Sequence, residues 1–527
     1  MVGAVNAIDG WNARGFRNGV VVAPHHIAAQ AGSEVLDAGG NAIDAIVAAN
    51  LALGVVAPYY CGVGGDLLAM VWDGSARGYR SVGRSPAGLD QPVVRRDSAG
   101  AVGMPIGGPH SVTVPGAVRG WFDLLDRWGT RSFGELAARA ISLADDGFVL
   151  SRPGAYRIRG SVQLAGVMHH DTADLAAVFD GHAAGSVLAQ PALAATLRLI
   201  ADDGSDAMYR GRLGAEVIET LQRHGGVMTA ADLAAHEAAW PTPMRATFAG
   251  RDVLELPPPT QGVTALEMLR IADGLDLDGD SVDRLHLLIE VVKIALADRD
   301  REVGDPDHMR IDPDDLLTDA HVDARRRDLD ARRASKPPPR PAADGGTAYL
   351  CAADRDGLMV SLIQSNFTAM GSGIHVPGRG INLHNRGSAF RLDDSPNGLA
   401  PSKLPMHTLI PGLVMGPDVP EVVFGSMGGH AQAQIHLQLL TRWLVDGTDL
   451  QHAISAPRFV VDPGTGRVDV EPRLPDGWIE ELQARGHVVG RARSIDDAMG
   501  HAHAIAPLDV GYLAAADPRA ESSASGW

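Results

Sequence analysis

Apolar residues recur every three or four positions in two consecutive stretches near the start of the chain. The first stretch begins at Pro24, a residue that suits the first turn of a helix, and it predicts an amphipathic helix. Gly39 and Gly40 end this pattern, and Asn41 is a suitable N-cap for a second helix, which ends before Pro58. The apolar positions of the two helices are Ile27, Ala28, Ala31, Val35 and Leu36, then Ile43, Ile46, Val47, Leu51 and Leu53. The pattern predicts a helical hairpin with a structural role.

Three further patterns follow. The segment YYCGVGGDLLAMVWDG predicts a glycine turn followed by an apolar strand, and HSVTVPGAVRGWFDLLDRWG predicts the start of another helix. A long helix is predicted over Asp283–Arg301. Its apolar face consists of Leu287, Leu288, Val291, Ile294 and Ala295.

The pattern changes abruptly at Thr347. Residues 321–346 are rich in charge and proline and lack an apolar period, which predicts a flexible linker. Strand-like sequence begins directly afterwards, at Thr347. The small and polar tail from Ala514 to Trp527 is predicted to be frayed.

Two strand-like runs, TAYLCAA and LMVSLIQ, flank the turn residues Asp354–Gly357 and predict a β-hairpin. A three-residue connection places Ser365 opposite Thr347, whereas a two-residue connection places Gln364 there. In either register, a threonine that follows two flexible glycines begins a strand beside a polar residue.

An unactivated threonine hydroxyl is a weak nucleophile. If the peptide bond before Thr347 is cut, the freed α-amine, with an ordinary pKa of about 7.7–8.0, can accept the proton of the hydroxyl. Gly345 and Gly346 permit the strained backbone that an internal acyl shift requires. Taken alone, Gly-Gly-Thr is a weak signal, and the segment is more typical of a surface hairpin after a linker.

Other polar residues stand in apolar surroundings. A strand ending at Phe424 runs into a glycine-rich turn with Gly428 and Gly429, followed by a helix. Such turns present free N–H groups to an anion, for example the oxyanion of acyl transfer, although a plain turn has the same sequence. Asn385, Arg386, His407 and Thr408 form two more polar groups, and each residue alone is compatible with a buried, satisfied side chain.

Composition narrows the range of functions. The 527 residues carry a formal charge of −18, which argues against a nucleic-acid or anionic-membrane binder. With 45% hydrophobic residues and two cysteines, Cys61 and Cys351, the chain needs no disulfide framework. The first residues contain no apolar segment of signal-peptide length, so we expect a cytoplasmic protein. No H-E-x-x-H or comparable spacing occurs, and we expect neither a metal nor a cofactor.

Nine segments, in this order, resemble the gamma-glutamyltransferase family over nearly the whole chain. They are GGNAIDAIVAANLALGVVAP, GVGGD, VPGAVRGW, LPPPTQG, HLLIEVVKIALADRDREVGDP, DGGTAYLCAADRDG, GSGI, LHNRGSAF and FGSMGGHAQAQ. This family consists of N-terminal nucleophile hydrolases. The resemblance therefore implies an α+β fold, a four-layer αββα sandwich, and self-cleavage between Gly346 and Thr347. The products would be a heavy chain, 1–346, and a light chain, 347–527, that form one intertwined unit.

The resemblance also implies roles for individual residues. Thr347 matches the nucleophile and Ser365 the second hydroxyl that hydrogen-bonds to it. Gly428 and Gly429 match the pair whose amides form the oxyanion hole, and Asn385 matches the asparagine before the amine pocket.

Three departures from the family pattern concern the substrate. Arg386 and Ala389 stand where the family has a glutamine and an acidic residue that bind the α-amine. His407 and Thr408 replace a serine pair, and Val82 replaces the arginine that binds the α-carboxylate. Arg84 lies two positions later and is a candidate substitute; Arg80 lies two positions earlier.

A pocket with Arg386 and no carboxylate favours an acyl group that has a carboxylate but no α-amine. The pattern is similar to the branch that includes oxamate amidohydrolases and some cephalosporin acylases. We therefore expect an autoprocessing amidohydrolase or acyltransferase that cleaves an amide of a small carboxylate-bearing acyl group through an acyl-threonine ester. Its partners would be a small-molecule amide and its own two chains. The alternatives are a genuine gamma-glutamyltransferase or glutathione hydrolase, and an inactive, uncut relative with a binding role.

Overall fold

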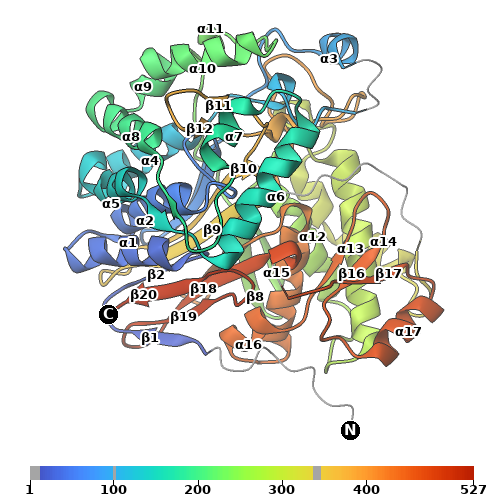
Figure 1. Ribbon diagram of the computed structural model, residues 1–527. Coiled ribbons are helices and arrows are strands. Elements are labelled where there is room, and N and C mark those ends of the chain that lie inside the picture. The colour runs from blue at the N-terminus through green and yellow to red at the C-terminus, as the bar shows by residue number, and fades with distance from the viewer. Residues whose placement is uncertain (1–11, 99–102, 336–345, 496) are drawn as a thin grey trace.

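Two antiparallel sheets lie face to face, and helices cover the outer face of each (Figure 1). The computed structural model describes residues 12–98, 103–335, 346–495 and 497–527. The resulting order of layers, helix–sheet–sheet–helix, is the αββα sandwich that the family resemblance implied, and this prediction is confirmed.

Each sheet combines strands from distant parts of the chain. The six-stranded sheet has the order β20 (Ser523–Gly526), β2 (Val20–Ala23), β9 (Gly346–Ala353), β10 (Met359–Phe367), β3 (Asp66–Trp72), β4 (Ala76–Ser81). The seven-stranded sheet has the order β1 (Arg14–Phe16), β19 (Tyr512–Ala516), β18 (His501–Pro507), β14 (Pro420–Met427), β13 (Gly412–Met415), β8 (Arg251–Glu255), β7 (Met244–Phe248). Short strands form three smaller sheets: β5 (Phe148–Val149) with β6 (Val187–Leu188), β11 (His375–Val376) with β12 (Ile381–Asn382), and β15 (Phe459–Val461) with β16 (Val468–Val470) and β17 (Val489–Arg491).

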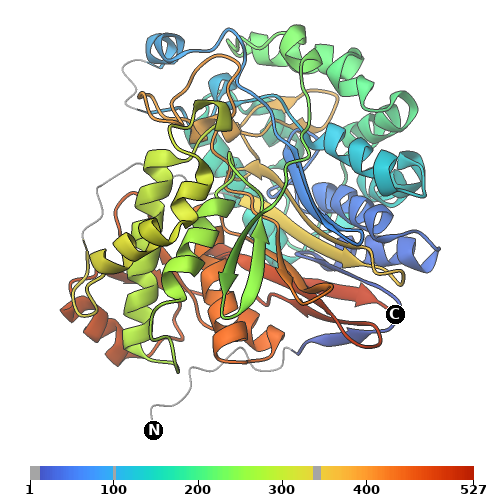
Figure 2. The same cartoon turned by 180° about the vertical axis from the view of Figure 1, so that it is seen from behind.

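Two groups of helices form the outer layers. The six-stranded sheet is covered by α1 (His26–Asp37), α2 (Ala42–Val56) and α4 (Ala117–Trp128). The seven-stranded sheet is covered by α12 (Gly262–Ala272), α15 (Gln432–Leu440) and α16 (Leu450–Ser455), with α13 (Val282–Glu302) packed on α12. The remaining helices are α3 (Gln91–Asp97), α5 (Phe133–Asp146), α6 (Arg152–Met168), α7 (Ala173–Phe179), α8 (Pro191–Asp203), α9 (Asp206–Tyr209), α10 (Arg212–Arg223), α11 (Ala230–Ala234), α14 (Asp319–Asp328) and α17 (Asp476–Ala484). The view from behind shows the hairpin β9–β10 between the two outer groups (Figure 2).

The predicted helical hairpin is present as α1 and α2. Asn41 caps α2 with its side chain, which accepts hydrogen bonds from the N–H groups of Ile43 and Asp44, and Asp44 completes a capping box. Every residue of α2 is buried, which suits a helix that is apolar on all sides and lies between other elements. The long helix predicted over Asp283–Arg301 is α13, and it extends one residue further at each end.

The two sheets meet closely at β9. Gly425 on β14 faces the ring of Tyr349 on β9, and a Cβ at Gly425 would lie 2.3 Å from Cε2 of Tyr349. The Tyr349 hydroxyl is 2.9 Å from Ser361 Oγ, which donates a hydrogen bond to the carbonyl of Phe424 at 3.1 Å. A glycine is therefore required at 425 for the sheets to approach.

Two predictions of irregular structure are wrong. Residues 321–328, assigned to the flexible linker, belong to α14, where Arg325 donates to the buried Asp298 and Arg326 donates to the carbonyl of Ile271. The predicted frayed tail instead forms β19 and β20. In both cases, tertiary partners satisfy polar groups in segments whose local sequence lacks an apolar period. Residues 336–345 of the predicted linker lie outside the described residues.

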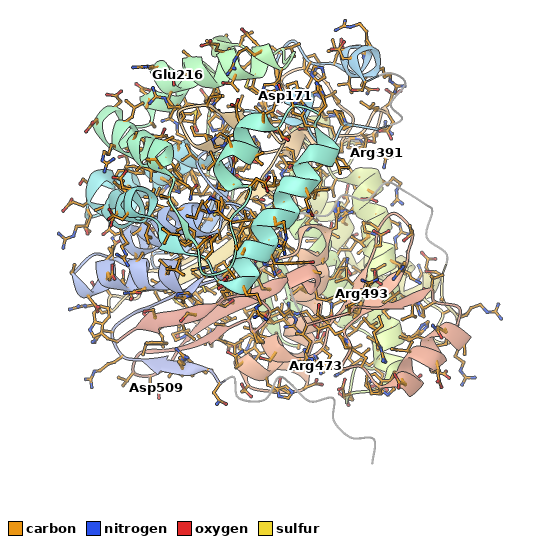
Figure 3. All side chains as sticks on the ribbon, in the orientation of Figure 1. Asp171, Glu216, Arg391, Arg473, Arg493 and Asp509 are labelled. Carbon is orange, nitrogen blue, oxygen red and sulfur yellow. The ribbon has the colours of Figure 1, made fainter. Side chains whose placement is uncertain are left out.

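The outside of the molecule is charged. The labelled residue Asp509 lies at its lower edge (Figure 3), whereas the polar side chains singled out in the sequence are buried, apart from the exposed Arg84 and the partly buried Arg80. Among the helices that the structure describes, none combines the length and the apolar character needed to cross a lipid bilayer.

Candidate active site

Thr347 and Ser365 lie side by side at the open end of the hairpin β9–β10. In the ladder, Ala348 is opposite Gln364, so the register is the one that pairs Thr347 with Ser365, although it shifts between Gln364 and Phe367. The two hydroxyl oxygens are 3.0 Å apart. The prediction that Ser365 neighbours Thr347 is confirmed.

The single proton of the Ser365 hydroxyl determines the direction of these hydrogen bonds. Ser365 Oγ donates to the carbonyl oxygen of Gly346 at 2.8 Å and accepts from the N–H of Phe367 at 2.8 Å. Because its proton is already used, Thr347 must donate to Ser365. Thr347 is fully buried, and its oxygen is held beside the peptide bond that joins it to Gly346.

Gly346 has no room for a side chain. A Cβ at this position would lie 2.8 Å from the carbonyl oxygen of Tyr59, a fixed backbone atom. The position before Thr347 is therefore restricted to glycine by packing.

The glycine pair 428–429 follows the end of β14 and precedes α15, as the sequence predicted. Gly428 has φ 151° and Gly429 φ 54°, conformations that strongly favour glycine. Gln261 joins this turn to a neighbouring loop, because its Nε2 donates to the carbonyls of Gly429 at 3.0 Å and Thr408 at 2.9 Å.

The sheet packing places this turn at the Thr347 end of β9. Gly425 of β14 packs on Tyr349 of β9. Met427 lies two residues after Gly425, and Thr347 lies two residues before Tyr349, so each points to the same face of its strand as that neighbour. The opposite end of β9 is marked by Asp354, whose carbonyl accepts a hydrogen bond from Tyr512 at the far end of the other sheet.

A buried carboxylate, Asp66, lies opposite Ser365 on β3. Its Oδ2 is 2.9 Å from His407 Nε2, 3.3 Å from His384 Nδ1 and 3.8 Å from Arg386 Nε. Burial alone would raise the pKa of Asp66, but the charge and hydrogen bonds of His384 and His407 outweigh burial and hold the pKa well below its ordinary value. Asp66 is therefore ionised, and its Oδ1 has no hydrogen-bond partner. We call Asp66, His384, Arg386 and His407 the Asp66 cluster.

Arg386 is the cation of this cluster. It is fully buried, its Cζ lies 3.8 Å from the ring centroid of Phe367, and its Nη1 donates to Thr408 Oγ1 at 3.2 Å. Burial lowers the pKa of Arg386 to about 9, against the opposing effect of Asp66. Its Nε and Nη2 have no hydrogen-bond partner. These two nitrogens form one edge of the guanidinium group and are available to a planar anion.

The side chain of Asn385 is occupied by contacts within the protein. Its Oδ1 accepts from the N–H of Thr368 at 2.9 Å, and its Nδ2 donates to the carbonyl of Ile106 at 2.7 Å. It fixes loops beside Arg386.

Arg84 lies apart from the Asp66 cluster. Its side chain is 46% exposed and pairs with Asp305 at 3.2 Å and Asp307 at 3.7 Å. It lines, with Arg80 and Val82, a cavity of about 260 Å³. Val82 directly follows β4, whose last residue, Ser81, is opposite Leu67 on β3. The cavity therefore begins at the strand next to the one that carries Asp66.

Sequence reasoning missed Asp66 and His384. The assumption that no carboxylate lies near Arg386 is wrong, because the register of β3 against β10 brings Asp66 to the same face as Ser365. Asp66 was visible as the last residue of the segment GVGGD, but its strand partner was not.

Three groups of side chains among the described residues could hold a metal ion: His25, His26 and Glu521; His286, Glu290 and His487; Glu267, Asp298 and His321. None of them includes Thr347 or a member of the Asp66 cluster. In the fully buried group, the ammonium of Lys293 donates to Glu290 at 2.8 Å and contacts His487 Nδ1 at 3.0 Å, so a protein cation already occupies that place.

Residues 28–527 match the sequence model of the family described as gamma-glutamyltranspeptidase. Among curated relatives, the glutathione hydrolase-like YwrD proenzyme of Bacillus subtilis is 34% identical over 96% of this chain and 98% of its own length. The oxamate amidohydrolase proenzyme of Klebsiella pneumoniae is 36% identical over 97% of this chain and 98% of its own length. The crystal structure of a cephalosporin acylase from Bacillus halodurans superimposes with a TM-score of 0.93 at 35% identity, covering 98% of this chain and 97% of that chain.

Proposed function

The chain belongs to the gamma-glutamyltranspeptidase family of N-terminal nucleophile hydrolases, and on this premise we propose that Thr347 first cuts its own chain and then serves as the acyl-accepting nucleophile of an amidohydrolase or acyltransferase. One observation carries the proposal: a single hydroxyl, Ser365, contacts both Thr347 Oγ and the carbonyl of Gly346.

Self-cleavage begins with attack of Thr347 Oγ on the carbonyl carbon of Gly346. Negative charge then develops on the Gly346 oxygen, and Ser365 already donates a hydrogen bond to that atom. The proton of the hydroxyl passes to the nitrogen of Thr347 as the C–N bond breaks, an ester between Gly346 and Thr347 Oγ remains, and water hydrolyses it. Several relatives bear the name proenzyme, which supports processing. The products are the chains 1–346 and 347–527.

The freed α-amine of Thr347 then acts as the general base for substrate. The hydroxyl attacks an amide carbonyl, the amine of the substrate leaves, and an acyl-threonine ester forms. Gly428 and Gly429 supply N–H groups to the oxyanion, and one such donor contributes about 2.7–4 kcal/mol to transition-state stabilisation. Ser365 orients the nucleophile. Water or an acceptor amine releases the acyl group.

The acyl group carries a carboxylate that binds the free edge of Arg386. Nε and Nη2 of the buried guanidinium make no hydrogen bond, although Asp66 lies 3.8 Å from Nε, and a substrate carboxylate matches both nitrogens at once. Thr408 and His407 hold Arg386 and Asp66 in place, and Asn385 fixes the loop beside them. Arg84 is the candidate for a longer acyl group that reaches the cavity. The name of the Klebsiella relative, an amidohydrolase of oxamate, agrees with a small carboxylate-bearing substrate.

A genuine gamma-glutamyltransferase or glutathione hydrolase is the second candidate, and Asp66 favours it. Its free Oδ1 offers a partner to an α-ammonium group, the role for which the sequence alone showed no residue. An uncut relative with a binding role is the third candidate. Two fragments in the cleavage experiment would exclude it, and a single intact chain would support it. The cytoplasmic location stays a prediction.

Replacing the nucleophile tests self-cleavage. Thr347→Ala should remain a single chain of 527 residues without amidase activity, because no hydroxyl is available to attack Gly346. Thr347→Ser keeps the hydroxyl and should still be cut. Intact-mass measurement and N-terminal sequencing of the smaller fragment give the result. Normal cutting of Thr347→Ala would refute the assignment.

A substrate series tests the acyl group. We expect glutaryl or oxamyl amides to be hydrolysed faster than a γ-glutamyl anilide. Arg386→Met should lower kcat/KM for the carboxylate-bearing amides about 10- to 100-fold, since a hydrogen bond to a charged group contributes about 1.5–3 kcal/mol. Arg84→Met is the matched control and should change the short substrates little. A strong preference for the γ-glutamyl compound would establish the second candidate instead.

A further inference from the structure

His501 is a buried histidine for which the reaction above has no role. It is the first residue of β18 and pairs with Met427, the last residue of β14 before the glycine turn. Its side chain is fully buried, and neither ring nitrogen has a hydrogen-bond partner. Such a doubly unsatisfied imidazole is rare inside a protein and calls for an explanation.

The packing of the sheets places His501 at the Thr347 end of the site. The ring of His503 stacks on the ring of Tyr349 with centroids 6.1 Å apart, and His501 stacks on His503 at 5.4 Å. Side chains two positions apart on a strand point to the same face. His501 therefore lies on the face of β18 that carries His503, and Thr347 on the face of β9 that carries Tyr349. The hydrogen bond from Tyr512 to Asp354 at the opposite end fixes the direction in which both strands run.

A second contact leads to the same place. The ring of Tyr60 lies 5.4 Å from that of His501, edge to face. The carbonyl of Tyr60 accepts a hydrogen bond from Asn366 beside Ser365, and the preceding residue, Tyr59, packs against Gly346. His501 therefore lies at the Thr347 end of the sheets, beside the segment 59–60 that packs against Gly346.

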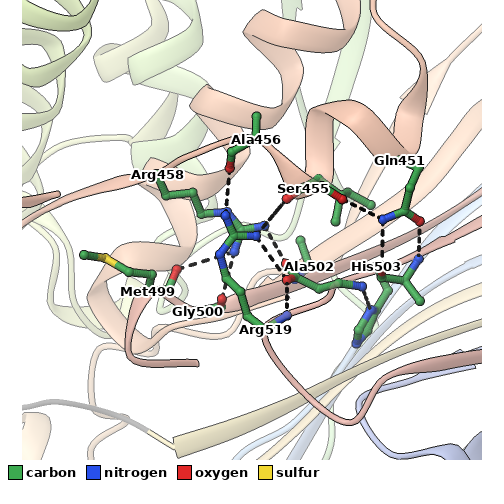
Figure 4. A network of polar contacts seen from close by, with 12 residues as sticks. Gln451, Ser455, Ala456, Arg458, Met499, Gly500, Ala502, His503 and Arg519 are labelled. Atoms are coloured by element: carbon green, nitrogen blue, oxygen red, sulfur yellow. Dashed lines mark hydrogen bonds and ion pairs between the residues drawn. The ribbon is translucent and has the colours of Figure 1, made fainter. Parts of the chain in front are cut away.

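The strand on both sides of His501 is held rigidly (Figure 4). Arg458 Nη1 donates to the carbonyl of Gly500 at 2.8 Å, and Asp517 Oδ2 accepts from the N–H of Ala502 at 2.8 Å. The N–H of Asp517 donates to His503 Nδ1 at 3.3 Å. The backbone of His501 thus has a fixed position although its ring is free of hydrogen bonds.

The missing partner of the ring is not supplied by the protein. Burial, and next the neighbouring His503, hold the pKa of His501 well below its ordinary value, so the ring is neutral. A neutral imidazole offers one donor and one acceptor to a small polar molecule. Beside an acyl-threonine ester, the small molecule that the reaction requires is water.

We propose that His501 positions the water that hydrolyses the acyl-Thr347 ester and so favours hydrolysis over transfer. This inference rests on the proposed function. The water oxygen attacks the ester carbonyl, its proton passes to the α-amine of Thr347, and the bond from the carbonyl carbon to Thr347 Oγ breaks. The amine returns the proton to Thr347 Oγ, and the free acid leaves. His501 hydrogen-bonds to the water and gains no net proton.

Competition between water and hydroxylamine tests this role. The mature enzyme is given an oxamyl or glutaryl anilide with a fixed concentration of hydroxylamine, and the acid and the hydroxamate are quantified. His501→Phe keeps the stacked ring but lacks both nitrogens, and the ratio of acid to hydroxamate should fall about 10-fold. His501→Gln keeps a donor and an acceptor and should recover part of the ratio. His503→Phe, the adjacent ring, should leave the ratio unchanged.

The product ratio separates positioning of water from a loss of structure. A damaged active site lowers both products together, so an unchanged ratio in His501→Phe and His501→Gln would overturn the inference. If His501→Phe is not cut, His501→Leu, which also lacks both nitrogens, decides by the same ratio. Failure of the proposed function would give a different result from failure of this inference. In that case Thr347→Ala would still form the acid and the hydroxamate.

Discussion

At the scale of single residues, the site depends on hydroxyl protons and on strained backbone. The Ser365 hydroxyl donates its one proton to the Gly346 carbonyl, so the hydrogen bond between Ser365 and Thr347 must be donated by Thr347. Phe367, two residues later, has φ 73°, a conformation that costs a non-glycine residue free energy and occurs mostly at functional sites. Its ring supports the guanidinium of Arg386. The strained residue thus connects the β9–β10 hairpin, with the proposed nucleophile, to Arg386, the proposed ligand of the substrate carboxylate.

Removal of the Ser365 hydroxyl should slow self-cleavage. Ser365→Ala removes the donor to the Gly346 oxygen, and we expect the rate to fall about 100- to 1,000-fold, as for loss of one oxyanion donor. Ser365→Thr retains the hydroxyl and is the control. The rate is measured from the appearance of the two fragments on denaturing gels after synthesis. Equal rates for Ser365→Ala and the unchanged chain would contradict the role.

At the scale of elements, buried polar pairs attach the outer helices to the sheets. Glu255 at the end of β8 lies 2.7 Å from His436 Nδ1 on α15. Burial raises the pKa of Glu255 well above its ordinary value and lowers that of His436 to about 3. Burial therefore favours the neutral form of both groups, and their hydrogen bond joins α15, which follows the glycine turn, to β8.

This pair predicts a pH dependence of stability. The raised pKa of Glu255 means that its contribution is complete below the ordinary carboxyl pKa, 4.5, and is lost as the pH rises through the folded-state value. Glu255→Gln keeps a neutral hydrogen-bonding group and should remove this loss. The midpoint of urea unfolding, measured between pH 5 and 9 in the uncut Thr347→Ala chain, should fall less with pH in Glu255→Gln. A parallel dependence in both proteins would contradict the prediction.

At the scale of the whole molecule, the two chains expected from cleavage before Thr347 would share both sheets. In the six-stranded sheet, β2 from the first product lies between β20 and β9 from the second, and β10 pairs with β3. In the other sheet, β13 pairs with β8 across the same division. Each product alone would leave open strand edges and bare apolar faces.

The two chains should therefore remain associated after cleavage. The mature protein should show two bands on a denaturing gel, but a native mass close to the 55.3 kDa of the whole chain or a multiple of it. Uncut Thr347→Ala should elute at the same position in gel filtration. Separation of the two chains in native buffer would contradict this expectation.

The sequence by itself determined the features that depend on near neighbours. Periodicity and capping defined α1 and α2, because a helix requires only residues three or four positions apart. Counting along the hairpin left Ser365 or Gln364 opposite Thr347, because one turn sets that register, and the structure has Ser365 there. The order of the motifs indicated the layered fold.

Only the tertiary structure decided which distant residues meet. Asp66 and His407 are 341 positions apart, and strand pairing together with sheet packing brings them to Arg386. The same packing brings His501 towards Thr347 and gives α14 its buried partner, Asp298. Local sequence cannot reveal these contacts, because the free energy that forms them comes from burial between layers rather than from neighbours along the chain.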